Sequence, residues 1–112
     1  MYQTVILPHF KRQLKPLLKK HRDLKASVIE LLQHFDVRQH DALGSSVYKI
    51  RLNTRSLSRG KSKSFRLIIL VMEVEHRLVP ITIYAKSDVN TLLQKEINDH
   101  LYAILSELHA FS

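Results

Sequence analysis

The residues of this chain that are best suited to chemistry are cations and one tyrosine on strand-like segments. Lys49 and Arg51 stand two positions apart in an alternating run, and side chains at this spacing share one face of a strand. Tyr84 and Lys86 have the same spacing in a later run, and Arg66 opens the apolar segment between the two runs. If these strands form one sheet, we expect the side chains to converge on one face, without a carboxylate among them.

Such a cluster of cations is disfavoured by repulsion unless an anion binds to it. If the anion is RNA, cleavage without metal requires proton removal from a ribose 2′-hydroxyl, neutralisation of charge on phosphoryl oxygens and protonation of the departing 5′-oxygen. Arginine holds phosphate through its fixed fork of donors, and a lysine crowded by cations exchanges its proton nearer neutral pH. Tyr84 can stack on a base or orient a phosphate.

An ordinary structural interpretation stays open for the same residues. Alternating Lys and Arg are common on exposed strand faces, and a strand tyrosine such as Tyr84 can simply cover the core. The overall charge favours an anionic partner: 18 Lys and Arg stand against 10 Asp and Glu, which gives a net charge of +8 and a pI of about 10.0. Nucleic acid, an acidic membrane surface and an acidic protein all fit this charge.

Other features of the composition narrow the class of protein. The chain has no cysteine, which excludes disulfides and thiolate metal sites and fits a reducing cytosol. The apolar run at residues 2–7 is too short for a signal peptide or a membrane span. We expect a soluble cytoplasmic protein that forms one domain over residues 1–112 and does not bind a membrane.

The elements that must position the candidate residues follow from hydrophobic periodicity. We expect an α+β fold with a small antiparallel sheet, helices packed on one side, and the order β-α-α-β-β-β-α. Pro8 should start the first helix and Pro16 should kink or interrupt it. The expected strands are residues 2–7, 47–52, 65–74 and 78–86; the expected helices are two on either side of a turn at 19–23 and one at 91–111; residues 38–46 are expected to form a loop.

Two details of the strands bear on the site. In the last strand, alternation places Val79, Ile81 and Ile83 toward the helices, and Pro80 indicates an edge or a bulge. Between the second and third strands lies a basic segment that we expect to be a loop contacting RNA or the ribosome. Its cations are Arg55, Arg59, Lys61 and Lys63.

Metal and cofactor sites find little support in the sequence. The chain has seven histidines but no HExxH pair, and the carboxylates are scattered over helices and turns. We expect His21, His40, His76 and His100 to lie at the surface. A phosphate-cradling glycine loop is excluded because the only glycines are Gly44 and Gly60. We therefore expect no metal and no small-molecule cofactor.

Three segments carry a resemblance to a known family. GSSVYKIRL, GKSKSFRLIIL and ITIYAKSD followed by QKEI resemble the RelE/ParE superfamily of bacterial type II toxins, and the likeness covers roughly residues 2 to 105. The resemblance implies a compact α+β domain related to small microbial ribonucleases. It also implies one of two activities: RelE-like members are mRNA interferases that cut messenger in the ribosomal decoding site, and ParE-like members poison DNA gyrase. Both are neutralised by an antitoxin.

The resemblance also assigns roles to residues of this chain. Lys49 and Arg51 match a basic pair used for proton transfer and phosphate binding, and Arg66 matches an arginine that stabilises the transition-state phosphate. Lys86 matches a basic residue that closes the last strand, while Lys61 and Lys63 fall in a loop that contacts ribosomal RNA in relatives.

This chain departs from the family pattern in three places. The segment DVNTLLQ has no aromatic residue where many relatives carry a base-stacking tyrosine, so Tyr84 is the candidate for that role. Arg51 replaces a frequent lysine and is a poor proton donor, so Lys49 is the better proton-transfer candidate. Lys63 and Ser64 replace paired glycines.

The leading hypothesis from the sequence is a type II toxin that acts as a ribosome-dependent, metal-independent mRNA endonuclease and inhibits translation. Its expected partners are the ribosome, mRNA and a cognate antitoxin with an acidic, partly disordered segment. The alternatives are a ParE-like gyrase inhibitor and a catalytically decayed toxin that only binds RNA or antitoxin.

Overall fold

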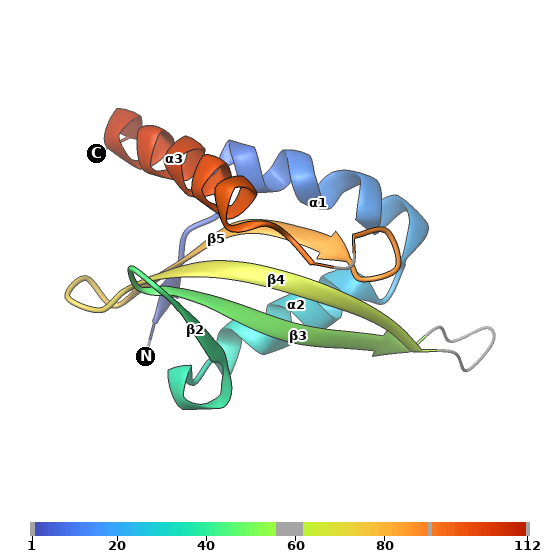
Figure 1. Cartoon of the computed structure of the whole chain (residues 1–112). Coiled ribbons are helices and arrows are strands. Elements are labelled where there is room, and N and C mark those ends of the chain that lie inside the picture. The colour runs from blue at the N-terminus through green and yellow to red at the C-terminus, as the bar shows by residue number, and fades with distance from the viewer. Residues whose placement is uncertain (1, 56–61, 90, 112) are drawn as a thin grey trace.

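A computed structural model describes residues 2–55, 62–89 and 91–111, apart from the side chains of Arg55, Ser62 and Phe111. The chain folds into a twisted sheet with helices on both of its faces (Figure 1). In chain order, the elements are β1 (Gln3–Thr4), α1 (Pro8–Lys20), α2 (Leu24–Gln33), a 3₁₀ turn η1 (Val37–Gln39), β2 (Asp41–Gly44), β3 (Val47–Arg55), β4 (Ser62–Met72), β5 (Arg77–Ala85) and α3 (Gln94–Phe111). The α+β class expected from the sequence is confirmed.

The sheet has the strand order β1-β5-β4-β3-β2 and is mixed, because β1 pairs in parallel with β5 while the other neighbours are antiparallel. The expectation of a purely antiparallel sheet is corrected by this short parallel strand. The segment expected to be a loop contains β2, which pairs with the first part of β3. A turn with positive φ at Gly44, Ser45 and Ser46 joins β2 to β3, and only the glycine adopts such angles without steric cost.

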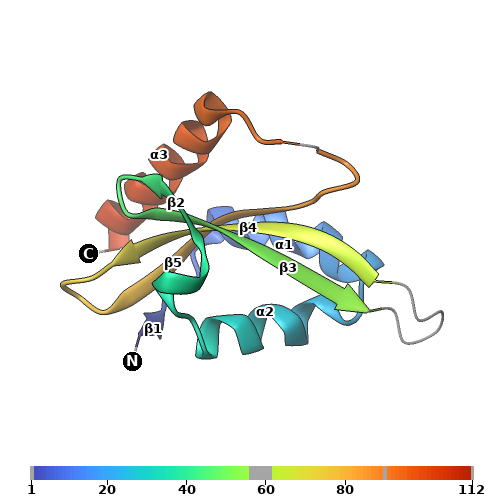
Figure 2. The same ribbon diagram turned by 60° about the horizontal axis from the view of Figure 1, so that its bottom comes forward.

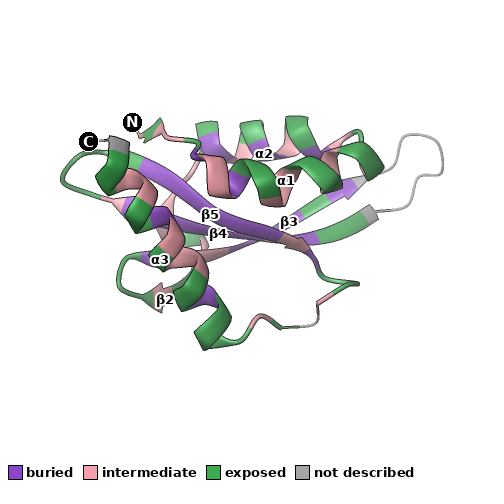
Figure 3. Ribbon diagram, turned by 90° about the horizontal axis from the view of Figure 1, so that it is seen from above, coloured by how far each residue is buried: buried purple, intermediate pink, exposed green. Residues whose placement is uncertain are grey.

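The helices cover opposite faces of the sheet, as Figure 3 shows. On β4, Leu67 and Ile69 belong to a core cluster with residues of α1 and α2, whereas Ile68 and Leu70 belong to a second cluster with residues of α3. The expectation that the helices pack on one side therefore holds for α1 and α2 and is corrected for α3. An amphipathic stripe shows that a helix packs on a core but does not say on which face.

The nearly continuous apolar sequence of β4 follows from this arrangement. Residues Leu67 to Leu70 are all buried, as expected of a strand covered on both faces. Truncating such a fully buried side chain, for example Ile69→Ala, removes packing that typically stabilises a protein by about 2–5 kcal/mol.

A bulge in β5 decides which of its residues reach each face. Ile68 of β4 pairs with Thr82 and Ile69 pairs with Pro80, so Ile81 is an extra residue. Val79 and Ile81 consequently pack in the α3 cluster, while Ile83 packs in the α1–α2 cluster. The bulge expected from Pro80 is confirmed, but the expectation that Val79, Ile81 and Ile83 share a face is wrong, because simple alternation stops at the bulge.

Helix α1 differs from its expectation at one position. It runs without interruption from Pro8 to Lys20 and includes Pro16, which is exposed. Proline removes one backbone hydrogen bond from a helix interior. Apolar residues of α1, such as Phe10, pack against the sheet both before and after Pro16.

Helices α1 and α3 are joined at one end by a small polar cluster. The ring nitrogens Nε2 of His9 and Nδ1 of His100 lie 2.8 Å apart, and the backbone N–H of His9 donates to the Glu107 carboxylate at 2.9 Å. Arg12 lies 3.7 Å from the same carboxylate. Burial, more than any other cause, lowers the pKa of both imidazoles below 6.5, with Arg12 adding to it for His9 and His9 for His100. The expectation that His100 lies at the surface is wrong, because it is half-buried.

This cluster predicts a pH dependence of stability. Since both folded-state pKa values lie below those of the unfolded chain, protons bind more readily to the unfolded chain, and stability falls as pH decreases from about 7 to about 5. We expect His100→Gln, which keeps a polar contact to His9, to lose less stability over this interval than wild type. Urea denaturation at about pH 7 and about pH 5 measures the change in the free energy of unfolding. A variant with the exposed His34 replaced, His34→Gln, is the control, and an unchanged pH slope in His100→Gln would contradict the prediction.

Candidate phosphate-binding face

The candidate residues lie in consecutive rows across three strands on one face of the sheet. Arg51 of β3 is paired with Arg66 of β4, which in turn is paired with Tyr84 of β5. In the next row, Lys49 is paired with Ile68. The convergence of Lys49, Arg51, Arg66 and Tyr84 expected from alternation is therefore present in the sheet. We call these four residues, three cations and a tyrosine in two neighbouring rows, the cationic row.

The two arginines of the cationic row are the feature with the strongest electrostatic consequence. Arg66 is half-buried and its guanidinium donates to the carbonyl oxygen of Phe65 at 3.1 Å, whereas Arg51 is exposed. In the part of the chain that the structure describes, no salt bridge reaches Arg66. Like charges directly opposite in a sheet destabilise it, and an anion that bridges the two guanidinium groups removes that cost.

One carboxylate lies closer to this face than the sequence indicated. Strand β2 places Asp41 opposite Lys49, and Asp41 lies 3.7 Å from the Arg51 guanidinium. The expectation of a face without carboxylates is thus corrected at its β2 edge. With side chains 69% and 59% exposed, this ion pair is weak and can open when a stronger anion arrives.

Tyr84 has a structural role at the end of the cationic row. Its ring packs against the cluster beneath α3, and its hydroxyl lies near the backbone N–H of Leu92. Burial raises the pKa of Tyr84, while the Leu92 hydrogen bond and the nearby Arg66 charge act in the opposite direction. Tyr84 therefore ties the segment before α3 to the sheet, which restricts its ring for stacking on a base.

The remaining basic candidates are not all on this face. Lys86 follows β5, is exposed, and its backbone N–H donates to Ser64 at 2.9 Å, so it extends the sheet beyond Tyr84. Lys63 lies within β4 opposite Thr54, one residue out of phase with Ser64 and Arg66, so it belongs to the opposite face. Its expected place in the basic loop is corrected accordingly.

Three basic candidates cannot be placed beside these. Arg59 and Lys61 lie outside the described residues, and Arg55 ends β3 with a side chain that also lies outside them.

A shallow hollow beside the cationic row brings in residues that sequence reasoning did not assign to the site. It is lined by Gln39 at the end of η1, by His40 and Asp41 where the chain enters β2, and by Lys49 and Arg51 of β3. His40 is half-buried and stacks on Phe35 with ring centroids 5.2 Å apart and planes 15° apart. The expectation that His40 lies at the surface holds only in part, because one side of its ring is covered by Phe35. The sequence did not predict that His40 lies beside Lys49 and Arg51, because this position depends on the pairing of β2, which the sequence encodes weakly.

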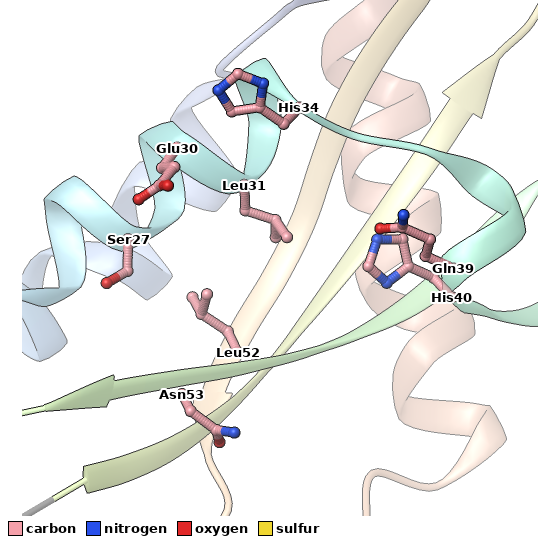
Figure 4. A pocket seen from close by; sticks show the side chains of 8 residues that line it. All are labelled: Ser27, Glu30, Leu31, His34, Gln39, His40, Leu52 and Asn53. Carbon is pink, nitrogen blue, oxygen red and sulfur yellow. The ribbon is translucent and has the colours of Figure 1, made fainter.

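A groove adjoins this hollow and shares Gln39 and His40 with it. Figure 4 shows that Leu31 of α2 and Leu52 of β3 point toward one another, with polar side chains around them. The groove encloses about 390 Å³ and is lined by Ser27, Glu30, Leu31, His34, Gln39, His40, Leu52 and Asn53. Asn53 also accepts a hydrogen bond from Ser64 at 3.0 Å, which links the groove to the row beyond Arg51.

The described residues offer neither a metal site nor a membrane-spanning helix. Within residues 2–55, 62–89 and 91–111, no three His, Asp or Glu side chains gather closely enough to hold a metal ion. No helix in the same part of the chain has the length and apolar character needed to cross a membrane.

Comparisons with known proteins identify similar folds only. No protein-family model and no curated protein match the chain. Among solved structures, an E. coli RelE toxin with two arginines replaced by alanine, in the free state, is 20% identical, covers 95% of this chain and 92% of that chain, and has a TM-score of 0.49. The isolated E. coli RelE toxin is 17% identical, with 93% and 99% covered and a TM-score of 0.46.

A third solved structure contains a partner protein. The intact E. coli RelBE toxin–antitoxin complex includes a chain that is 19% identical, covering 74% of this chain and 94% of that chain, with a TM-score of 0.49. At this level of identity and structural overlap, the chemistry of this chain has to be argued from its own residues.

The cationic row predicts that inorganic phosphate stabilises the protein. A ligand that binds only the folded chain raises the free energy of unfolding, by about 2.7 kcal/mol at 100 times its Kd. We expect Arg66→Gln to lose most of this phosphate-dependent gain, and Lys63→Gln, on the same strand but the opposite face, to keep it. Urea denaturation in phosphate and in chloride of equal ionic strength measures the gain. Equal losses in the two variants would mean that phosphate acts through overall charge.

Proposed function

We propose that this chain is the toxin of a type II toxin–antitoxin system and that it cleaves mRNA on the ribosome without a metal ion. The observation that carries the proposal is the pairing of Arg51 with Arg66 on an open sheet face, beside Lys49. The sequence segments that resemble RelE-like nucleases contain these same three residues. The net charge of +8 adds a general attraction to RNA.

The reaction that these groups support is attack of a ribose 2′-oxygen on the adjacent phosphorus. Arg66 and Arg51 contact the non-bridging phosphoryl oxygens, where negative charge develops, through paired N–H donors. Lys49, as an ammonium group, donates a proton to the departing 5′-oxygen. The products are a 2′,3′-cyclic phosphate and a free 5′-hydroxyl, and the proton of the 2′-hydroxyl goes to a base.

The surrounding residues hold this arrangement in place. Tyr84 fixes the segment that precedes α3 through Leu92 and lies next to Arg66, so it limits the space that the guanidinium can explore. Asp41 holds Arg51 loosely until the phosphate displaces it. Preorganised donors of this kind cost little reorganisation during the reaction.

The proposed partners follow from the same charge distribution. An exposed cationic face is complementary to the phosphates of mRNA and ribosomal RNA. It is equally complementary to an acidic, partly disordered segment of a cognate antitoxin, which would block RNA by occupying the face.

Cleavage of a defined mRNA in a translation extract, mapped by primer extension, tests the proposal. Removing one transition-state donor typically lowers a rate by about 10²–10³-fold, so we expect Arg66→Ala to lose the ribosome-dependent cuts. Lys25→Ala, which removes an exposed cation of α2 away from the cationic row, should keep them. Cleavage by Arg66→Ala at the wild-type rate would exclude the proposed role of the cationic row.

One observation favours a second candidate function, inhibition of DNA gyrase. Tyr84 is tied to Leu92 and packed on the core, and the segment before α3 has no aromatic residue, so a freely stacking ring is missing from this part of the site. A chain that stops growth with its mRNA intact and reduces plasmid supercoiling would support this candidate. Loss of both activities with RNA binding retained would indicate a toxin that has lost catalysis.

A further inference from the structure

The proposed cleavage needs two groups that move protons, and the cationic row supplies only one with a clear role. Arginine keeps its proton at all ordinary pH values, so Arg51 and Arg66 cannot act as bases. The Tyr84 hydroxyl accepts a hydrogen bond from Leu92, and its raised pKa makes it a poor source of phenolate. If Lys49 donates the proton to the leaving oxygen, another group must take the proton from the 2′-hydroxyl.

His40 occupies a position that fits this role. Its imidazole lines the same hollow as Lys49 and Arg51, next to Asp41, at the edge of the sheet. The ring is held by stacking on Phe35, a contact that does not use its nitrogens. A nucleotide bound along this edge of the sheet therefore meets a fixed imidazole beside the cations.

We infer that His40 is the general base of the proposed endonuclease and takes the proton from the attacking 2′-hydroxyl. In this step the 2′-oxygen–phosphorus bond forms and the phosphorus–5′-oxygen bond breaks. The 2′-hydroxyl proton moves to a ring nitrogen of His40, and a proton of the Lys49 ammonium moves to the 5′-oxygen, so atoms and charge balance. The inference rests on the proposed function and adds a residue to it.

The environment of His40 is consistent with a neutral imidazole at physiological pH. Burial, the largest cause, lowers its pKa, while the carboxylates of Asp36 and Asp41 act in the opposite direction. Asp36 is already bound to Arg38 by two short contacts, and Asp41 lies near Arg51. The other charged and titratable groups that line the hollow or the adjoining groove are Lys49 and Arg51 of β3, Glu30 of α2 and His34 at the end of α2.

The test compares two His40 variants with a matched histidine control. His40→Phe keeps a ring to stack on Phe35 and removes both nitrogens, and His40→Gln keeps polarity without a titrating base. His34→Gln replaces an exposed histidine that lines the groove but not the hollow. Thermal unfolding of each variant identifies any that does not fold, and the other His40 variant then carries the test.

The measurement is the single-turnover cleavage rate of a defined mRNA on purified, programmed ribosomes between about pH 5.5 and 8.5. The wild-type rate should rise with pH as His40 loses its proton. We expect both His40 variants to cut about 10²–10⁴-fold more slowly, with unchanged ribosome binding and without this acid limb. His34→Gln should retain the wild-type rate and pH profile.

Two negative outcomes are distinguishable. Folded His40 variants that cut at the wild-type rate with the same acid limb would overturn the role of His40 and leave the endonuclease proposal standing. Absence of cutting by the wild type itself, with ribosome binding intact, would overturn the endonuclease proposal and this inference together.

Discussion

The fold depends on burying β4 on both of its faces. Leu67 and Ile69 pack against α1 and α2, while Ile68 and Leu70 pack against α3. The second covering is incomplete, because α3 lies over the end of the sheet near the β2–β3 turn and away from the other end of β3 (Figure 2). Where α3 stops, the same face of β4 changes from isoleucine and leucine to Arg66. The open cationic face and the apolar core are therefore two parts of one sheet surface, and the reach of α3 sets the border between them.

The bulge at Ile81 makes that border possible on β5. Before the bulge, Val79 and Ile81 face α3, and after it Thr82 and Tyr84 lie on the face of Arg66. If the same sequence paired without a bulge, strict alternation would place Tyr84 on the face opposite Val79, toward the α1–α2 core. The bulge thus keeps apolar residues under α3 and still places a tyrosine beside the arginines. Tyr84 lies at this border on β5, because its hydroxyl is near the backbone of Leu92 in the segment that leads into α3.

Much of this arrangement could be predicted from local patterns, and the failures share a cause. The alternation around Lys49 and Arg51, the buried run of β4 and the amphipathic stripe of α3 are local signals, and each of these elements is present. Strand β2 has only four residues, and its sequence DALG carries little strand preference, so its pairing depends on the turn at Gly44 to Ser46. The position of the β5 bulge and the face chosen by α3 depend on distant partners. Asp41 and His40 were missed as site residues because only β2 brings them to β3.

These misses matter because a row of arginines can bind a phosphate but cannot by itself exchange protons. The pattern of cations on β3 and β4 predicts where an anion sits, and that part of the site is encoded locally. Acid–base chemistry needs a group that can accept a proton, and in the described part of the hollow the candidate is His40, which is held against Phe35 beside Asp41 at the weakly encoded edge of the sheet. If the proposed function holds, a short strand at that edge matters for cleavage, because the chain that enters β2 lines one hollow with Lys49 and Arg51 and contributes His40 to it.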